Sequence, residues 1–308
     1  MQRYIFIRLL QAIFVLFVVS IIVFGLTRLS GSPVDFMLPF NATQDDRDRL
    51  EAYWGLDRSM PEQYFKFLEN AVNGGFGESV KWPGNTAMGM IKSRTVATLQ
   101  LASAGLGLAL VLALVFGVLS AVKKDTPIDY VGKIFAILGQ SAPPFWVGIV
   151  LIWIFSVELG WLPTSGRGGF KHYILPVVTL GWFQVAAVMR LVRSSMLDAL
   201  GSEYVKLARV KGLPEWKIVW KHALRNAAIV PLTYFGIIAG WLVMGTVIVE
   251  TVFAWPGIGL LAFEALVGRD FQVVQAVVIV AAFVFVVINL VVDVLYAYLD
   301  PRIRLGEG

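Results

Sequence analysis

Six long apolar stretches alternate with shorter polar segments along this chain of 308 residues. An α-helix needs about 20 apolar residues to cross the hydrocarbon core of a bilayer, and each stretch approaches or exceeds that length. The pattern predicts an all-α polytopic membrane protein with six transmembrane helices, at Leu9–Leu26, Leu99–Val122, Ile134–Val157, Ile174–Val192, Ala227–Val252 and Val273–Tyr298.

One sizeable polar segment separates the first predicted transmembrane helix from the second. Thr43 with Asp46, and Ser59 with Glu62, have the spacing of capping boxes, which begin helices by satisfying free backbone N–H groups. We expect the first helix to end near Gly55 and the pair to form a small helical cap outside the membrane. The predicted organisation has three parts: a first transmembrane helix within 1–29, an extracytoplasmic segment at 30–96 and a core transmembrane domain at 97–308.

Composition agrees with a membrane protein and narrows its chemistry. Hydrophobic residues make up 57% of the chain and charged residues 15%, with a mean hydropathy of +0.73, which is too apolar for a soluble globular domain. Cysteine is absent, so a disulfide framework and a thiolate metal site are excluded. The isoelectric point near 9.4 suggests nucleic acid at first sight, but the cations lie beside the apolar stretches. We therefore expect a lipid bilayer, and no nucleic acid, as a partner.

The distribution of Lys and Arg predicts the orientation. The short loops on one side of the predicted membrane carry only Arg167, Lys171 and Arg269. By the positive-inside rule, the richer side is cytoplasmic, which places both termini in the cytoplasm. The first apolar stretch lacks a small-x-small cleavage site, so we interpret it as a retained helix. The cations of the richer side are Arg3, Arg8, Lys123, Lys124, Lys133, eight within 190–225, Arg302 and Arg304.

A cytoplasmic loop within 203–231 has the sequence pattern of two short helices with a bend. Gly212 and Pro214 are residues that end one helix and permit another to begin. An amphipathic helix with a small residue on its contact face suits a groove in a partner protein. Four residues share one helical face at i, i+3, i+4 and i+7 spacing: Tyr204, Leu207, Ala208 and Lys211.

This loop resembles the coupling loop of ABC importer permeases, in which an Ala and a Gly four residues apart mark the helix that docks on the ATPase. Ala208 and Gly212 occupy those two places. Lys206 stands where the general motif has an acidic residue, and His222 and Arg225 replace a later Ile and Pro. The variant found here is similar to the dipeptide and oligopeptide importer permeases, with Tyr204-Val205, Ala208-Arg209, Lys211-Gly212 and then His222-Ala223-Leu224-Arg225-Asn226.

The resemblance to this family, and to its B-type permease subunit, covers nearly the whole chain. It implies a permease of an ATP-driven importer in a bacterial plasma (inner) membrane, working with a homologous second permease, two cytosolic ATPase subunits and an extracytoplasmic solute-binding protein. It implies no cofactor in this chain, because ATP and Mg²⁺ would bind to the ATPases. It assigns ATPase coupling, in a loop at about 196–226, to Glu203, Tyr204, Leu207, Ala208, Lys211 and Gly212. The other segments that carry it are Trp54–Asp57, Gly75–Ser79, Gly139–Trp146, Glu250–Gly259 and Leu299–Arg304.

Pro143-Pro144 breaks the predicted third span and leaves backbone carbonyls without partners in their own helix. Within a membrane such a break is tolerated only against protein or a water-filled cavity. We predict a translocation passage there, although each polar side chain alone has a second interpretation, as a hydrogen bond between packed helices. The predicted passage residues are Gln140, Ser141, Trp182, Gln184, Thr246 and Glu250.

We do not expect an enzyme. Gly132-Lys133 lacks the rest of a Walker A motif, and neither His172 nor His222 has a partner at metal-ligand spacing. Three alternatives remain open: a permease of the same architecture for a nickel chelate, haem or glutathione, an ion-coupled secondary transporter, and a structural membrane subunit. The absence of an ionisable residue at the centre of any predicted span weighs against ion coupling.

Overall fold

The computed structural model describes residues 2–29, 31–32, 34, 38 and 41–299, with side chains described at all of these except 2–5, 237, 239–245 and 292–299. Helices make up nearly all the regular structure of this part, and an isolated β-bridge links Glu78 to Thr86. Spatial proximity divides the chain into two compact units, Met1–Ala97 with Pro256–Gly308, and Thr98–Trp255. The three-part division by membrane position stays a prediction.

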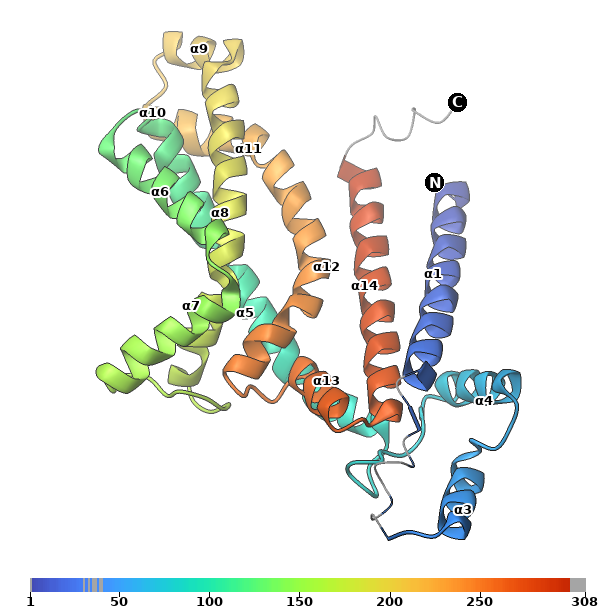
Figure 1. Ribbon diagram of the computed structural model, residues 1–308. Helices are drawn as coiled ribbons and strands as arrows, with labels where there is room; N and C mark the ends of the chain where they lie inside the picture. The colour runs from blue at the N-terminus through green and yellow to red at the C-terminus, as the bar shows by residue number, and fades with distance from the viewer. Residues whose placement is uncertain (1, 30, 33, 35–37, 39–40, 300–308) are drawn as a thin grey trace. The chain divides into compact units, whose positions relative to one another are not determined.

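The first unit is built on two long helices that pack side by side, α1 (Gln2–Leu29) and α14 (Phe271–Leu299) (Figure 1). It also contains α3 (Gln44–Trp54), α4 (Met60–Val72), the beginning of α5 (Ala87–Val122) and α13 (Ile258–Val267). An apolar core joins α1, α4, the beginning of α5, α13 and α14, and α3 contributes no buried residue to it. Its buried members include Phe24, Phe67, Phe76, Ile91, Leu261 and Val273.

The local sequence signals for α3 and α4 are confirmed. The Thr43 backbone N–H donates to Asp46 Oδ2 at 3.0 Å, and the Asp46 backbone N–H donates to Thr43 Oγ1 at 3.3 Å. The Thr43 hydroxyl also donates to Asp46 Oδ2 at 2.7 Å, and this bond, followed by that from the Thr43 N–H, holds the pKa of Asp46 below its usual range. Gly55 ends α3 at φ +65°, and the Ser59 N–H donates to Glu62 Oε2 at 3.2 Å at the start of α4.

The second unit is arranged around α8 (Lys171–Gly201), which contacts most of the other helices of this unit. Along it pack α6 (Pro127–Ser141), α7 (Pro144–Leu151) and α12 (Ile229–Val252). At one end of α8 lie α9 (Glu203–Val210), α10 (Glu215–Lys217), the π-helix η2 (Ile218–Ala223) and α11 (Leu224–Ala227). Figure 1 shows α7 at the opposite end of α8 from α9.

The break predicted at Pro143-Pro144 is confirmed and is sharp. The helix pair Pro127–Ser141 and Pro144–Glu158 is bent by 106°, and the second member ends in the π-helix η1 (Ile152–Glu158). Proline lacks the backbone N–H that would continue the helical hydrogen bonds, so two in succession end α6 and begin α7. The predicted third span is therefore two differently oriented helices.

Among the described residues, four helices are long and apolar enough to cross a membrane, or five if the bent pair counts as one crossing. The four are Phe6–Leu29 in α1, α5, α8 and Phe271–Val291 in α14. The second of them begins at Ala87 rather than at Leu99, so this helix is longer than the sequence pattern predicted. The structure supports a polytopic helical membrane protein, and the count of six stays a prediction.

Several glycines of the second unit lie at close contacts between helices. A Cβ on Gly117 of α5 would lie 2.7 Å from the Val192 side chain and 3.0 Å from the Met189 carbonyl oxygen, both on α8. A Cβ on Gly139 of α6 would lie 2.6 Å from the Ala186 Cβ. Small residues allow membrane helices to approach closely, and here they set how tightly α5 and α6 pack on α8.

Gly117→Ala and Gly107→Ala form a matched pair on α5, because nothing lies within 4 Å of a Cβ on Gly107. We expect Gly117→Ala to destabilise the protein by about 1–3 kcal/mol through overpacking. We expect Gly107→Ala to be neutral or to stabilise it by up to about 1 kcal/mol, because alanine favours the helix. The measurement is the thermal unfolding midpoint of the detergent-purified proteins. Equal midpoints would contradict the close packing of α5 on α8.

Candidate functional site

The end of α9 has the hydrogen bonds of a Schellman motif. The Gly212 N–H donates to the Arg209 carbonyl at 2.9 Å, and the Leu213 N–H donates to the Ala208 carbonyl at 3.2 Å. Gly212 has φ +73°, a left-handed conformation that a residue with a Cβ adopts only with strain. The predicted bend is therefore present, and glycine is required there for its backbone.

The two faces of α9 have different surroundings. Val205 and Ala208 are buried, the latter 8% exposed, on the side where α9 contacts α8 and η2. Tyr204 and Leu207 point away from the unit and are 41% and 55% exposed. The predicted contact face is thus divided, because Ala208 packs inside its own chain. A role for Ala208 in ATPase coupling stays a prediction.

The remaining predicted coupling residues lie at the surface. Glu203 and Lys211 are exposed, and Glu203 pairs with Lys206 Nζ at 2.7 Å. Beyond the bend, Trp216 and Trp220 are exposed while Ile218, Val219 and Ala223 are buried. Arg209 Nε and Glu215 Oε1, 2.7 Å apart, form an ion pair across the bend. The sequence pattern did not assign these two tryptophans to the contact surface, and they add exposed aromatic area to this end of the unit.

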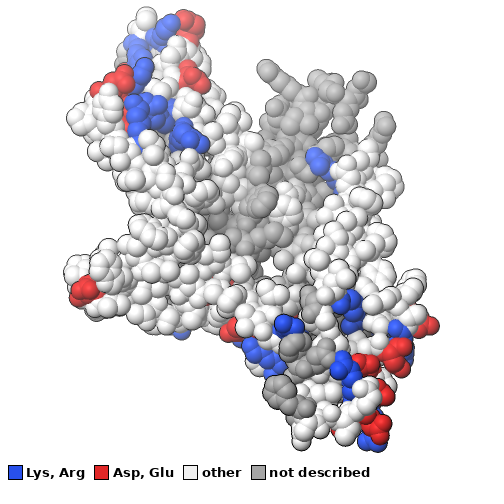
Figure 2. Space-filling model, in the orientation of Figure 1, with Lys and Arg blue, Asp and Glu red and all other residues white. Residues whose placement is uncertain are grey.

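Charged side chains of the second unit gather at the end that carries α9 and α10 (Figure 2). The surface of the same unit toward α7 shows few charges in this view. Other cations near this end are Lys133 of α6, Arg193 of α8, and Lys123 and Lys124 in the turn between α5 and α6. The charge distribution agrees with a unit whose α9 end lies outside the hydrocarbon region.

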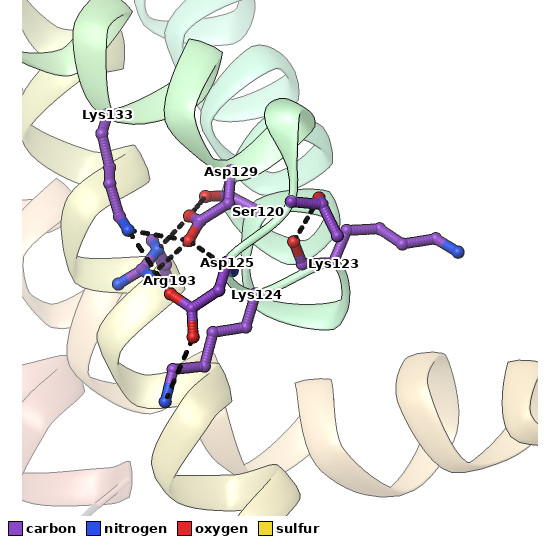
Figure 3. Close-up of polar contacts among 8 residues, drawn as sticks. Ser120, Lys123, Lys124, Asp125, Asp129, Lys133 and Arg193 are labelled. Carbon is purple, nitrogen blue, oxygen red and sulfur yellow. Dashed lines mark hydrogen bonds and ion pairs between the residues drawn. The ribbon is translucent and has the colours of Figure 1, made fainter.

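A buried carboxylate, Asp129, connects three helices near this end (Figure 3). Arg193 of α8 binds it with two N–H groups, Nε to Oδ1 at 2.7 Å and Nη2 to Oδ2 at 2.9 Å. Ser120 Oγ of α5 donates at 2.5 Å, Lys133 Nζ lies 2.9 Å away, and the Asp125 N–H donates at 3.0 Å. The sequence pattern did not predict this cluster, since Asp129 and Arg193 are 64 residues apart and belong to no motif.

Four of the predicted passage residues lie on α6 and α8. Gln140 Oε1 accepts a hydrogen bond from Arg190 Nη1 at 3.0 Å, and the exposed Ser141 Oγ donates to the Ile137 carbonyl of its own helix at 2.9 Å. Trp182 stacks edge-on against Phe135, with ring centroids 4.5 Å apart, and its buried Nε1 has no hydrogen-bond partner among the described residues. Gln184 is partly exposed.

The other two predicted passage residues, Thr246 and Glu250, are buried on α12. Glu250 Oε1 accepts a hydrogen bond from Thr98 Oγ1 of α5 at 2.7 Å. Both side chains are therefore held inside the second unit, whereas Gln140, Ser141 and Gln184 reach its surface at least in part. The six residues do not share one open surface in this conformation, and the passage role of each stays a prediction.

Known proteins match nearly the whole length of the chain. Residues 113–305 match the family described as "Binding-protein-dependent transport system inner membrane component", and residues 1–102 match the N-terminal region of the same kind of membrane component. The glutathione transport system permease protein GsiC of Escherichia coli K12 is 39% identical over 305 residues, 99% of each chain. The oligopeptide transport system permease protein AppB of Bacillus subtilis 168 is 37% identical over 315 residues, 99% of this chain and 100% of that one.

A solved structure supports the fold. A chain in a crystal structure of an amino acid ABC transporter with histidines superposes with a TM-score of 0.52 at 17% identity, covering 69% of this chain and 94% of that chain. The class is thus a helical membrane permease. The chain belongs to the family of inner-membrane components of binding-protein-dependent transport systems, as the resemblance of its coupling loop implied.

Asp129→Asn tests whether the buried carboxylate holds the three helices together. Removing one partner of a fully buried ion pair costs about 3–5 kcal/mol, and we expect about 2 kcal/mol here because Arg193 and Lys133 keep some solvent contact. Asp125→Asn is the control, since its ion pairs are 3.9–4.0 Å long and exposed, and such pairs contribute at most about 1 kcal/mol. Thermal unfolding midpoints measure both. Equal losses would contradict the structural role of Asp129.

Proposed function

We propose that this permease forms half of the membrane passage of an ATP-driven importer for di- and oligopeptides. Its relatives are named as oligopeptide and glutathione permeases, and glutathione is itself a small peptide, so the two names point to one chemical class of solute. The family match weighs against ion coupling. The second candidate function within that class is a permease of the same architecture that carries glutathione.

Coupling to the ATPases takes place through the exposed side of α9. The observation that carries this assignment is that α9 is held from behind by Val205 and Ala208, so Tyr204 and Leu207 project from a fixed helix. An amphipathic helix presented in this way suits a hydrophobic groove of a partner, with Lys211 at its edge. Each nucleotide-driven movement of the ATPase would then be passed to α8 through rigid contacts.

The partners follow from this arrangement. Two cytosolic ATPase subunits bind ATP and Mg²⁺, a homologous second permease completes the passage, and a solute-binding protein delivers the peptide from outside. The family match, to components of transport systems that depend on a binding protein, supports this composition. We favour a heterodimer of two permeases over pairing with a second copy of this chain.

The proposed topology has six crossings, with both termini in the cytoplasm and α3 and α4 outside. The helix α12, of 24 residues, supplies the crossing beyond the four long helices and the bent pair. The α9 end of the second unit is then cytoplasmic, in agreement with its gathered cations (Figure 2). The passage runs past Gln140, Ser141, Trp182 and Gln184, and Thr246 and Glu250 reach it only in another state of the transport cycle.

Gly212→Val and Gly201→Val provide a matched test of coupling. Nothing lies within 4 Å of a Cβ at either position, and only Gly212 has a positive φ, so the pair isolates the backbone requirement. Left-handed strain of about 1–2 kcal/mol at Gly212 should misplace the end of α9. We expect ATP-dependent peptide uptake to fall about five- to tenfold in Gly212→Val and to stay near wild type in Gly201→Val.

Mass spectrometry of the intact purified complex is the control for this pair, since both variants should still assemble with the second permease and the ATPases. Normal uptake by an assembled Gly212→Val complex would refute the coupling assignment of α9. Loss of assembly in both variants would show that the substitution at either glycine disturbs the permease itself.

Single cysteines test the topology, because the chain contains no cysteine of its own. The positions Ser59, Lys171, Lys124 and Lys217 are all exposed in the structure. A membrane-impermeant maleimide should label cysteines at Ser59 and Lys171 in intact cells, and those at Lys124 and Lys217 only after the cells are opened. Labelling of a Lys217 cysteine from outside would contradict both the orientation and the ATPase contact.

A further inference from the structure

A polar cavity of about 290 Å³ lies within the first unit, between α3, α4 and the ends of α1 and α14 that adjoin them. Its lining contains three cations and no Asp or Glu. No residue of the proposed passage or of the coupling segment belongs to it. The lining residues that carry the inference are Arg28, Trp54, Arg58, Gln63, Gln272 and Gln275.

Two side-chain carbonyl oxygens of residues that line this cavity have no donor among the described residues. Gln63 is only 8% exposed, and its Nε2 donates to the Leu56 and Arg58 carbonyls at 3.1 and 2.7 Å. These two bonds fix the orientation of the amide, which leaves Gln63 Oε1 buried without a partner. Gln272 Oε1, from α14, is buried without a partner as well. Buried polar atoms nearly always have a hydrogen-bond partner in folded proteins, so we expect a donor for each of these two acceptors.

Two N–H donors in the same lining also lack acceptors. They are Arg28 Nε and Trp54 Nε1, both buried. The guanidinium of Arg28 lies 5.2 Å from the Phe24 ring centroid, and no carboxylate pairs with it within the described part of the chain. Arg28 is half-buried, and removing a cation even partly from water without a counter-charge is costly, which favours an anionic group in the cavity. Lys66 is neutralised by Glu69 at 2.9 Å, so Arg28 and Arg58 dominate the charge.

We propose that this cavity binds the main chain of a small zwitterion, an amino acid or short peptide. Its carboxylate accepts hydrogen bonds from Arg28 and Trp54, and its ammonium or amide N–H groups donate to Gln63 and Gln272. The volume, close to the lower end of typical ligand pockets, suits a molecule of this size. The identity of the solute rests on the proposed peptide permease function, and the site adds a binding position for that solute on the α3–α4 side of the first unit.

Calorimetric titration of the intact complex, in phosphatidylcholine nanodiscs without receptor or nucleotide, tests the site. The probes are Ala–Ala, the Ala–Ala amide and acetate. We expect Ala–Ala to bind, and its amide, which lacks the carboxylate, to bind at least about tenfold more weakly, as expected for a lost charge-assisted pair. Arg28→Met should weaken Ala–Ala binding by a similar factor. Arg49→Met, on exposed α3 surface outside the cavity, should leave it unchanged.

A second variant tests the site without relying on the folding of Arg28→Met. Gln272→Leu removes one acceptor, so it should weaken Ala–Ala binding and leave acetate binding unchanged, because acetate donates no hydrogen bond. The site is overturned if Ala–Ala does not bind or if Arg28→Met binds it normally, which is the outcome for a cavity filled by water. The site is also overturned if Arg28→Met leaves Ala–Ala binding unchanged and alters only the affinity of the complex for phosphatidylglycerol or for the receptor.

Uptake by the wild-type complex distinguishes the two proposals. ATP-driven peptide uptake with no calorimetric binding would remove this site and leave the permease function in place. Absence of peptide uptake in the presence of receptor and ATP would instead contradict the proposed function, whatever the titration shows.

Discussion

A carboxylate can be buried only when nearby cations and hydrogen-bond donors neutralise its charge. The partners of Asp129 come from three helices. Ser120 of α5, Lys133 of α6 and Arg193 of α8 all contact it (Figure 3). The bidentate geometry with Arg193 fixes direction as well as distance. Because α9 follows α8 directly, the position of the proposed ATPase contact depends on how firmly this cluster holds α8 against α5 and α6.

Rigid packing on one side of α9 and exposure on the other give the second unit its proposed mechanism. Glycine contacts bring α5 and α6 close to α8, and Val205 and Ala208 are buried on the side where α9 contacts α8 and η2. Tyr204 and Leu207 are then exposed on a helix whose other side is held by close packing. A push on these side chains would move α8 as a body, and α8 carries Trp182 and Gln184. The same helix thus connects the predicted coupling residues with predicted passage residues.

Local sequence signals predicted local structure well. The capping boxes at Thr43 and Ser59, the left-handed Gly212 and the break at Pro143-Pro144 each depend on a few neighbouring residues, and all four are present. The spacing of Tyr204, Leu207 and Ala208 predicted a helix but not which side of it is covered, because that depends on η2 and α8 folding back against it. The buried state of Glu250 and the unpartnered atoms around Gln63 likewise arise from tertiary contacts. Asp129 and Arg193 pair across 64 residues, and no short-range pattern reports such a contact.

The most direct test of this account compares cysteine reactivity at two neighbouring positions of α9. In the isolated permease, Leu207→Cys should react rapidly with a maleimide and Ala208→Cys slowly, since only the first side chain is exposed. Addition of the ATPase subunits should protect the Leu207→Cys position by about tenfold or more, as expected when a side chain enters a desolvated contact, and leave Ala208→Cys as slow as before. Equal reactivity at the two positions, or no protection of Leu207→Cys in the assembled complex, would contradict the account.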